Sequence, residues 1–154
     1  MESLTKRQFE VLMKEYDLLQ SRIRDYDARV FQIKGWSTTI FSAALGLAIL
    51  QNKPLLLLVP LFACFIFWGL DALFKSFQHI MIERAYEVEA IFNGNSTSVE
   101  VGLVTHSFER RDKKLFGRIK RVGKILFLFN VMALYIGKLV ILSVVGFVLL
   151  NGYA

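Results

Sequence analysis

The stretch ILFLFNVMALYIGKLVILSVVGFVLL at residues 125–150 is one of three apolar runs that decide the fold. The other two are GWSTTIFSAALGLAILQ at 35–51 and PLLLLVPLFACFIFWGLDALF at 54–74. Each run is long enough, or nearly so, to cross a hydrocarbon core, which needs about 20 helical residues. A soluble chain of 154 residues has too little interior to bury so much apolar sequence. The sequence therefore predicts an all-α integral membrane protein with three transmembrane helices.

The distribution of basic residues predicts how the chain crosses the membrane. Seven Lys and Arg residues precede the first run and ten lie between residues 75 and 124, whereas the link between the first two runs has only Lys53. Because cytoplasmic loops are enriched in Lys and Arg, we expect a multi-pass inner-membrane protein with a cytoplasmic N-terminus. The expected parts are a cytoplasmic heptad helix (1–34), a transmembrane hairpin (35–75), a cytoplasmic helical segment with a basic cluster (76–122), and a third transmembrane helix with an external tail (123–154).

Two apolar stripes outside the runs predict helix packing. The first part has a heptad seam, in which spacings of three and four alternate; it comprises Phe9, Leu12, Tyr16, Leu19, Ile23, Tyr26, Val30 and Ile33. No proline interrupts it, so one helix should run from about Thr5 into the first crossing. A stripe at helical spacing follows the second run at Phe77, Met81, Ala85, Val88 and Phe92. The seam can pack on this stripe in an intramolecular hairpin, on other copies in a homo-oligomer, or on both with different faces.

Signatures of enzymes are missing from the sequence. It has no phosphate loop, no paired-histidine metal motif and no dinucleotide fingerprint. The two histidines, His79 and His106, are isolated, and the single cysteine, Cys64, has no partner for an intramolecular disulfide. We therefore expect no enzyme, no catalytic residue, no metal site and no cofactor.

The net charge is concentrated in one segment. Residues 103–124 carry eight basic and two acidic side chains, and so account for the whole net charge of +6. A cationic helix beside a membrane can fix topology and bind anionic lipid headgroups. It can also bind an anionic nucleotide or short oligonucleotide, because the planar guanidinium of arginine binds two phosphate oxygens at once. The candidate ligand-binding residues are Arg110, Arg111, Lys113, Lys114, Arg118 and Arg121.

Lys138 stands near the middle of the third run, where a lysine costs on the order of 3 kcal/mol. Such a charge should face a partner or water. Asp71, near the cytoplasmic end of the second run, is one candidate partner. The alternative is a water-filled pore, in which a ring of lysines would favour anions. The candidate pore or gate residues are Lys138, Asn130 and Ser42.

Ser42 belongs to a face of small residues on the first run, which allows either close helix packing or pore lining. The other members of this small-residue face are Gly35, Thr39 and Gly46.

Several short stretches between residues 20 and 90 resemble a group of small bacterial membrane proteins. They are YDAR at 26–29, FQIKGWS at 31–37, FWGLDALFKSFQ at 67–78 and EVEA at 87–90. They look like the membrane effectors of antiphage defence operons, the SLATT-like class, which pair with nucleotide-signal synthases, as in Hailong-type systems. The resemblance implies paired crossings with a cytoplasmic helix, control by a nucleotide or DNA oligomer, and a nucleotidyltransferase encoded nearby.

Two functions are compatible with these features. The first is an oligomeric, ligand-controlled ion channel that depolarises the host membrane during abortive infection, with the gate in the third crossing. The second is a non-conducting membrane adaptor that recruits a cytoplasmic partner through its heptad helix.

If the basic cluster binds a nucleic acid signal, short single-stranded DNA should bind the purified protein in a fluorescence anisotropy titration. Each phosphate neutralised on a single strand contributes about −0.7 to the slope of log affinity against log salt. We expect Arg110→Ala and Arg118→Ala to weaken binding and to reduce this slope, while Lys53→Ala changes neither. If the protein does not bind DNA or nucleotides even at low salt, the cluster serves as a lipid anchor.

Overall fold

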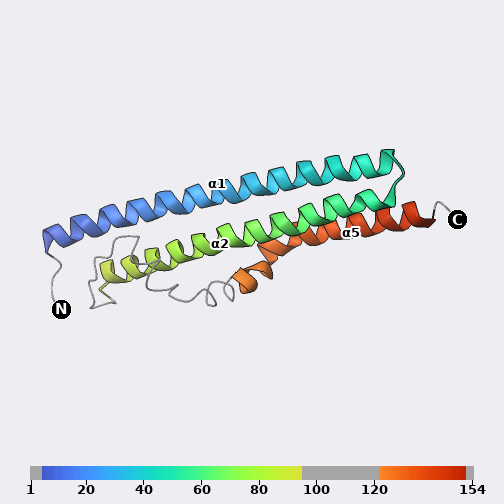
Figure 1. The fold of residues 1–154 in the computed structure, drawn as a ribbon. Helices are drawn as coiled ribbons and strands as arrows, with labels where there is room; N and C mark the ends of the chain where they lie inside the picture. Colours follow the sequence, from blue (N-terminus) through green and yellow to red (C-terminus); the bar gives the residue numbers. More distant parts are fainter. Residues whose placement is uncertain (1–4, 95–121, 152–154) are drawn as a thin grey trace. The chain divides into compact units, whose positions relative to one another are not determined.

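The computed structural model describes residues 5–94 and 122–151 (Figure 1). Within these ranges all regular structure is helical, and comprises α1 (Lys6–Leu50), the short 3-10 helix η1 (Pro54–Leu57), α2 (Leu58–Phe92) and α5 (Phe129–Asn151). Three helical segments are long and apolar enough to cross a membrane, namely Lys6–Leu50, Pro54–Phe92 and Phe129–Asn151. The predicted all-α architecture with three potential membrane spans is therefore confirmed, and the chain is a membrane-spanning protein by the length and composition of its helices.

The first helix is continuous, as its uninterrupted seam predicts. α1 begins at Lys6, directly after Thr5, and passes through Gly35 without a break. At its start the Gln8 side chain reaches back to Thr5, and the backbone N–H of Thr5 donates to Gln8 Oε1 at 3.0 Å, which is one half of a capping box. This contact satisfies one of the amide groups that a helix start leaves without an intrahelical partner.

The link between α1 and α2 is a tight turn. Asn52 adopts a positive φ of 52°, a conformation that asparagine tolerates better than most side chains. Lys53 is extended, as the residue before a proline tends to be, and Pro54 opens η1. The turn lets the chain reverse direction within a few residues, so α2 can pair with α1.

The chain divides into two compact units, and one of them combines residues up to Ala28 with those from Lys75 onward. The described part of this unit is an antiparallel pairing of α1 with α2. As residue numbers rise along α1, those of the partners fall along α2. Tyr16 Oη donates to Glu89 at 2.7 Å, Gln78 Nε2 donates to the Ile23 carbonyl at 3.2 Å, and Lys75 Nζ donates to Asp27 at 3.2 Å.

The core of this hairpin is the predicted heptad seam packed on the predicted stripe of α2. Leu12 and Leu19 are fully buried, and they form one cluster with Met81, Ala85, Val88 and Ile91. Tyr16, Ile23, Tyr26 and Phe92 pack against this cluster from partly buried positions. The intramolecular alternative for the seam is therefore present in the structure.

A buried ion pair fixes the register of the hairpin. The Arg84 guanidinium donates to Glu15 on α1 at 2.9 Å and to Glu87 on its own helix at 3.1 Å. Burial alone would lower the pKa of Arg84, but the hydrogen bonds and charges of the two glutamates outweigh it and raise the pKa. The guanidinium therefore stays charged, and sliding α1 along α2 would separate it from Glu15 in a low-dielectric setting.

The pKa values of Asp27 and Tyr16 in the hairpin are also shifted. Burial acts to raise the pKa of Asp27, but hydrogen bonds from Gln78 and Lys75 outweigh it and lower the pKa. The pKa of Tyr16 is raised because its hydroxyl donates to Glu89. Both contacts are therefore present at neutral pH. The Asp27 contribution is lost as the pH falls through its lowered pKa, and the Tyr16 contribution is lost as the pH rises through its raised pKa.

The other unit combines Arg29–Phe74 with the chain from Val122 onward and contains the apolar spans. The third apolar run begins at Ile125, but α5 begins only at Phe129, since a turn and a bend at Phe127 and Leu128 separate it from the helical residues 122–126. The Trp68 indole N–H donates to the Leu126 carbonyl at 3.1 Å, so this helix end has a partner for its exposed carbonyl. Ile125 packs with Ala72 and Val131 in a small buried cluster.

Leu19 and Leu18 offer a matched test of the hairpin. Leu19 has 0% of its surface exposed and Leu18 has 46%. Leu19→Ala should lower the free energy of unfolding by about 2–5 kcal/mol, because it leaves a cavity in the core. Leu18→Ala should stay within about 0.5 kcal/mol of the parent. Thermal unfolding in detergent, followed by circular dichroism, measures both; equal losses would mean that α2 does not cover this face of α1.

Candidate functional site

The sequence-derived candidate residues fall into two groups. The candidate ligand-binding residues, Arg110, Arg111, Lys113, Lys114, Arg118 and Arg121, lie outside the residues that the structure describes. The pore or gate candidates, Lys138, Asn130 and Ser42, are described, and all three belong to the unit that contains the apolar spans. The structure does not gather them at one point. Instead, it connects Lys138 and Asn130 to two different residues of α1.

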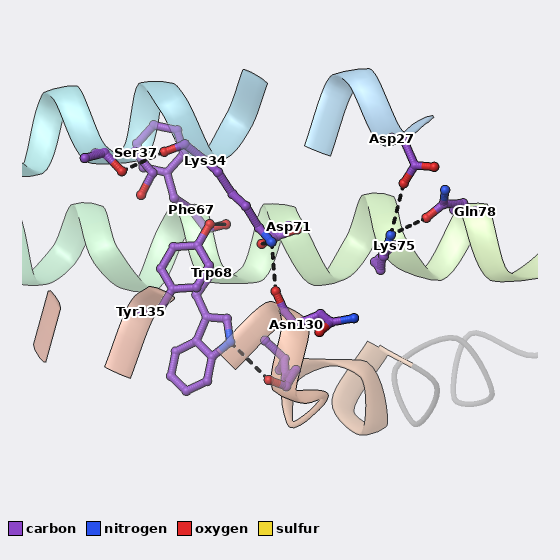
Figure 2. Close-up of polar contacts among 12 residues, drawn as sticks. Asp27, Lys34, Ser37, Phe67, Trp68, Asp71, Lys75, Gln78, Asn130 and Tyr135 are labelled. Atoms are coloured by element: carbon purple, nitrogen blue, oxygen red, sulfur yellow. Dashed lines mark hydrogen bonds and ion pairs between the residues drawn. The ribbon is translucent and has the colours of Figure 1, made fainter. Parts of the chain in front are cut away.

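Lys34 on α1 joins all three helices of this unit. Its ammonium lies 3.7 Å from Asp71 Oδ2 on α2 and donates to the Asn130 carbonyl of α5 at 2.8 Å. Figure 2 shows the Lys34 side chain extending past Asp71 to Asn130. The Asp71 side chain is fully buried, whereas that of Lys34 keeps 28% of its surface exposed. Lys34 therefore supplies a positive charge beside a carboxylate that is excluded from solvent.

Lys138 makes different contacts from those expected of a partner of Asp71. Its ammonium donates to the Ser37 hydroxyl of α1 at 2.7 Å, and the residue is only 4% exposed. The ammonium also lies over two aromatic rings, 5.8 Å from the Phe41 centroid and 5.2 Å from the Tyr135 centroid. Among the described residues, its contacts are thus with a neutral hydroxyl and two rings, and none is with a carboxylate.

The direction of the Lys138 side chain follows from helix geometry. Lys138 lies eight residues beyond Asn130, or about 12 Å along α5, whereas Ser37 lies three residues beyond Lys34, or about 4.5 Å along α1. Side chains of a helix lean toward its N-terminus, so Lys138 reaches back toward the level of the Lys34–Asn130 contact. The ammonium therefore lies closer to that end of the spans than the position of Lys138 in the sequence suggests.

The other polar contacts between α5 and α2 surround Tyr135, which is fully buried. The Tyr135 hydroxyl donates to the Phe67 carbonyl at 3.1 Å, and the Cys64 thiol donates to the Tyr135 carbonyl at 3.8 Å. The ring stacks on Trp68 with centroids 6.1 Å apart (Figure 2). Lys34, Trp68 and Ser37 contact the same part of the chain. The described polar contacts that α1 and α2 make with the last described segment therefore lie between residues 126 and 138.

The small-residue face of α1 is not covered by the described part of the chain. Gly35, Thr39 and Ser42 are exposed, and a Cβ atom added at Gly35 or Gly46 would meet nothing within 4 Å. Thr39 satisfies its hydroxyl within its own helix by donating to the Gly35 carbonyl at 3.1 Å. This face therefore does not mediate close helix packing among the described helices, and it is available to lipid or to another copy of the chain.

Comparisons of the chain with protein-family models, with curated proteins and with solved structures find no match. Among residues 5–94 and 122–151, no group of three or more His, Cys, Asp and Glu side chains is placed to hold a metal ion.

Sequence reasoning missed the partners of the charged groups. The sequence allows Lys138 either a pairing with Asp71 or a place in a water-filled pore, whereas in the structure Asp71 lies beside Lys34 and Lys138 donates to Ser37. One signal was available for Tyr135, since a residue three positions before Lys138 shares its helix face. The pairing of Lys34 with Asp71 depends on the offset between α1 and α2, which the apolar pattern of the runs does not fix.

Lys34→Met tests the bridge among the three helices. We expect a loss of about 3 kcal/mol in unfolding free energy, at the lower end of the range for a broken buried pair because Lys34 is partly exposed. A second change, Asp71→Asn, should restore part of the loss because it removes the buried negative charge. Lys53→Met, in the exposed turn, should change stability by less than about 0.5 kcal/mol. If the double variant is no more stable than Lys34→Met in thermal unfolding, Lys34 does not stabilise the protein through Asp71.

Proposed function

We propose that the chain is an oligomeric ion channel that depolarises the host membrane in antiphage defence under the control of an anionic nucleotide or oligonucleotide. The observation that carries this proposal is the ammonium of Lys138. It lies inside the apolar part of the protein and is held by a neutral hydroxyl and two rings. A purely structural helix gains nothing from such a group, because charges within a membrane are costly and are usually retained for transport or sensing.

The exposed small-residue face supports an oligomer. Three helices are too few to enclose a pore, so conduction requires several copies. Leu12 and Leu19 of the heptad seam are covered by α2, so these two side chains are not accessible to other copies of the chain. Faces of small residues let membrane helices approach closely, and Gly35, Thr39 and Ser42 are exposed in the span of α1. We therefore assign contact between copies to this face.

The proposed setting rests on the resemblance to SLATT-like membrane effectors and on the charge of the chain. Residues 103–124 account for the net charge of +6, and a cytoplasmic cluster of this kind suits a phosphate-bearing signal. Control by a nearby nucleotidyltransferase, a cytoplasmic N-terminus and an inner-membrane location belong to the same proposal.

The adaptor function is weakened by the packing of the hairpin. An adaptor that recruits a partner through the heptad seam needs the seam to be accessible, but Leu12, Leu19 and the side chains around them pack on α2. Recruitment through the seam would require the hairpin to open and to expose its core.

Current through a planar lipid bilayer tests the channel. Purified protein should conduct in a KCl gradient, in the presence or in the absence of a short DNA oligomer. Lys138→Leu should shift the reversal potential toward that of potassium, because a lysine near the ion path favours anions. The size of the oligomer, measured by light scattering, should not change.

Ser143→Ala is the matched control for this experiment. Ser143 lies on the same helix but is exposed, and its hydroxyl donates to the Leu139 carbonyl of its own helix. It should leave the reversal potential unchanged. A protein that never conducts above the level of an empty bilayer, with or without nucleotides, would favour the adaptor.

A further inference from the structure

Ser37 differs from the other hydroxyl-bearing residues in the span of α1. Thr38 and Thr39 are exposed, and each donates to a carbonyl one turn earlier in its own helix. Ser37 is buried, with only 1% of its surface exposed, and its oxygen accepts the hydrogen bond of Lys138 from α5. Ser37 thus differs from Thr38 and Thr39 because its hydroxyl contacts a different helix, α5.

The surroundings of Ser37 enclose the Lys138 ammonium. Phe41 lies one turn further along α1, and Tyr135 lies one turn before Lys138 on α5, so the two rings flank the hydrogen bond from different helices. Both aromatic residues are buried. An aromatic face attracts a cation electrostatically, and this attraction is stronger where water is excluded. The hydroxyl and the two rings are therefore the groups that can stabilise the Lys138 ammonium where water is excluded.

This placement has a consequence for the proposed pore. A lysine that lines a water-filled path must be wet, whereas Lys138 is 4% exposed within its own three-helix bundle. A pore assembled from several copies runs between protomers, outside this bundle. In the present structure the charge of Lys138 is therefore withdrawn from any such path.

We propose that Ser37 is the positioning residue of Lys138, and that its hydroxyl holds the ammonium in a withdrawn, non-conducting arrangement. The inference rests on the proposed channel function and adds to it a residue and a resting state. Conduction then requires Lys138 to leave Ser37 and to turn toward the path between protomers. The signal can drive this change only by binding the two arrangements with different affinity.

Substitutions at Ser37 should move the channel in opposite directions. Ser37→Ala removes the acceptor, so in the lower-conducting condition, with or without the DNA oligomer, the current should rise several-fold. Ser37→Asp supplies a carboxylate to the ammonium, so in the higher-conducting condition the current should fall several-fold. Ser37→Thr keeps the hydroxyl and should behave as the parent, as should the neighbouring control, Thr38→Ala.

A stability cycle gives a readout that does not depend on conduction. Ser37→Ala should lower Tm by about 2–4 °C in the parent, the shift expected for the loss of one hydrogen bond in a chain of this size. In a Lys138→Leu background the same change should lower Tm by less than about 1 °C, because the contact is already lost.

The outcomes separate the two proposals. If Ser37→Ala lowers Tm equally in both backgrounds, Ser37 does not position Lys138, whatever the currents show. If the channel conducts but Ser37→Ala and Ser37→Asp both give currents like Thr38→Ala, Ser37 does not hold a non-conducting state. If no variant conducts but the cycle shows coupling, the channel function fails and the positioning role of Ser37 stands.

Discussion

The arrangement of the spans depends on the two contacts of the Lys34 ammonium. In a bilayer, apolar helices gain little by leaving lipid for one another, so packing and hydrogen bonds decide which helices associate. Lys34 connects α1 to a buried carboxylate on α2 and to a backbone carbonyl at the start of α5. One side chain thus fixes the level of three helices, and the contacts of Trp68, Tyr135 and Lys138 follow within a few turns of it.

The hairpin of α1 and α2 is stabilised by different means. Its core consists of Leu, Met, Ala, Val and Ile side chains, whose burial is favourable in water but contributes little between helices in lipid. Its register is fixed by the Arg84–Glu15 pair, and the Tyr16–Glu89 and Asp27–Lys75 contacts extend along its edges. The same helix, α1, therefore packs an apolar core flanked by polar pairs in one unit, and in the other it is joined to its neighbours by the polar contacts of Lys34 and Ser37.

Much of the fold could be predicted from the sequence, because hydropathy and helical period act locally. The three runs predict the spans, and the spacing of Leu12 and Leu19 with Met81, Ala85 and Val88 predicts the hairpin. The partners of charged groups could not be predicted, since they depend on side-chain reach and on the offset between helices. Lys138 shows the reason: its position in the run suggests mid-membrane depth, but its side chain leans toward Ser37. The break before the start of α5 at Phe129 likewise lies beside a contact between helices, in which the Trp68 indole N–H donates to the Leu126 carbonyl.

The described polar contacts to the third helical segment end at Lys138, and this gives α5 unequal ends. From Lys138 to Asn151 the helix extends roughly 20 Å. Over this distance Gly146 lies beside an apolar side chain, that of Leu57. A rigid rod fixed near one end acts as a lever, so a tilt of about 10° around Lys138 would displace Asn151 by about 3 Å over this helical rise. Because Leu142 and Leu149 are buried along this part of α5, such a tilt would break apolar packing rather than hydrogen bonds.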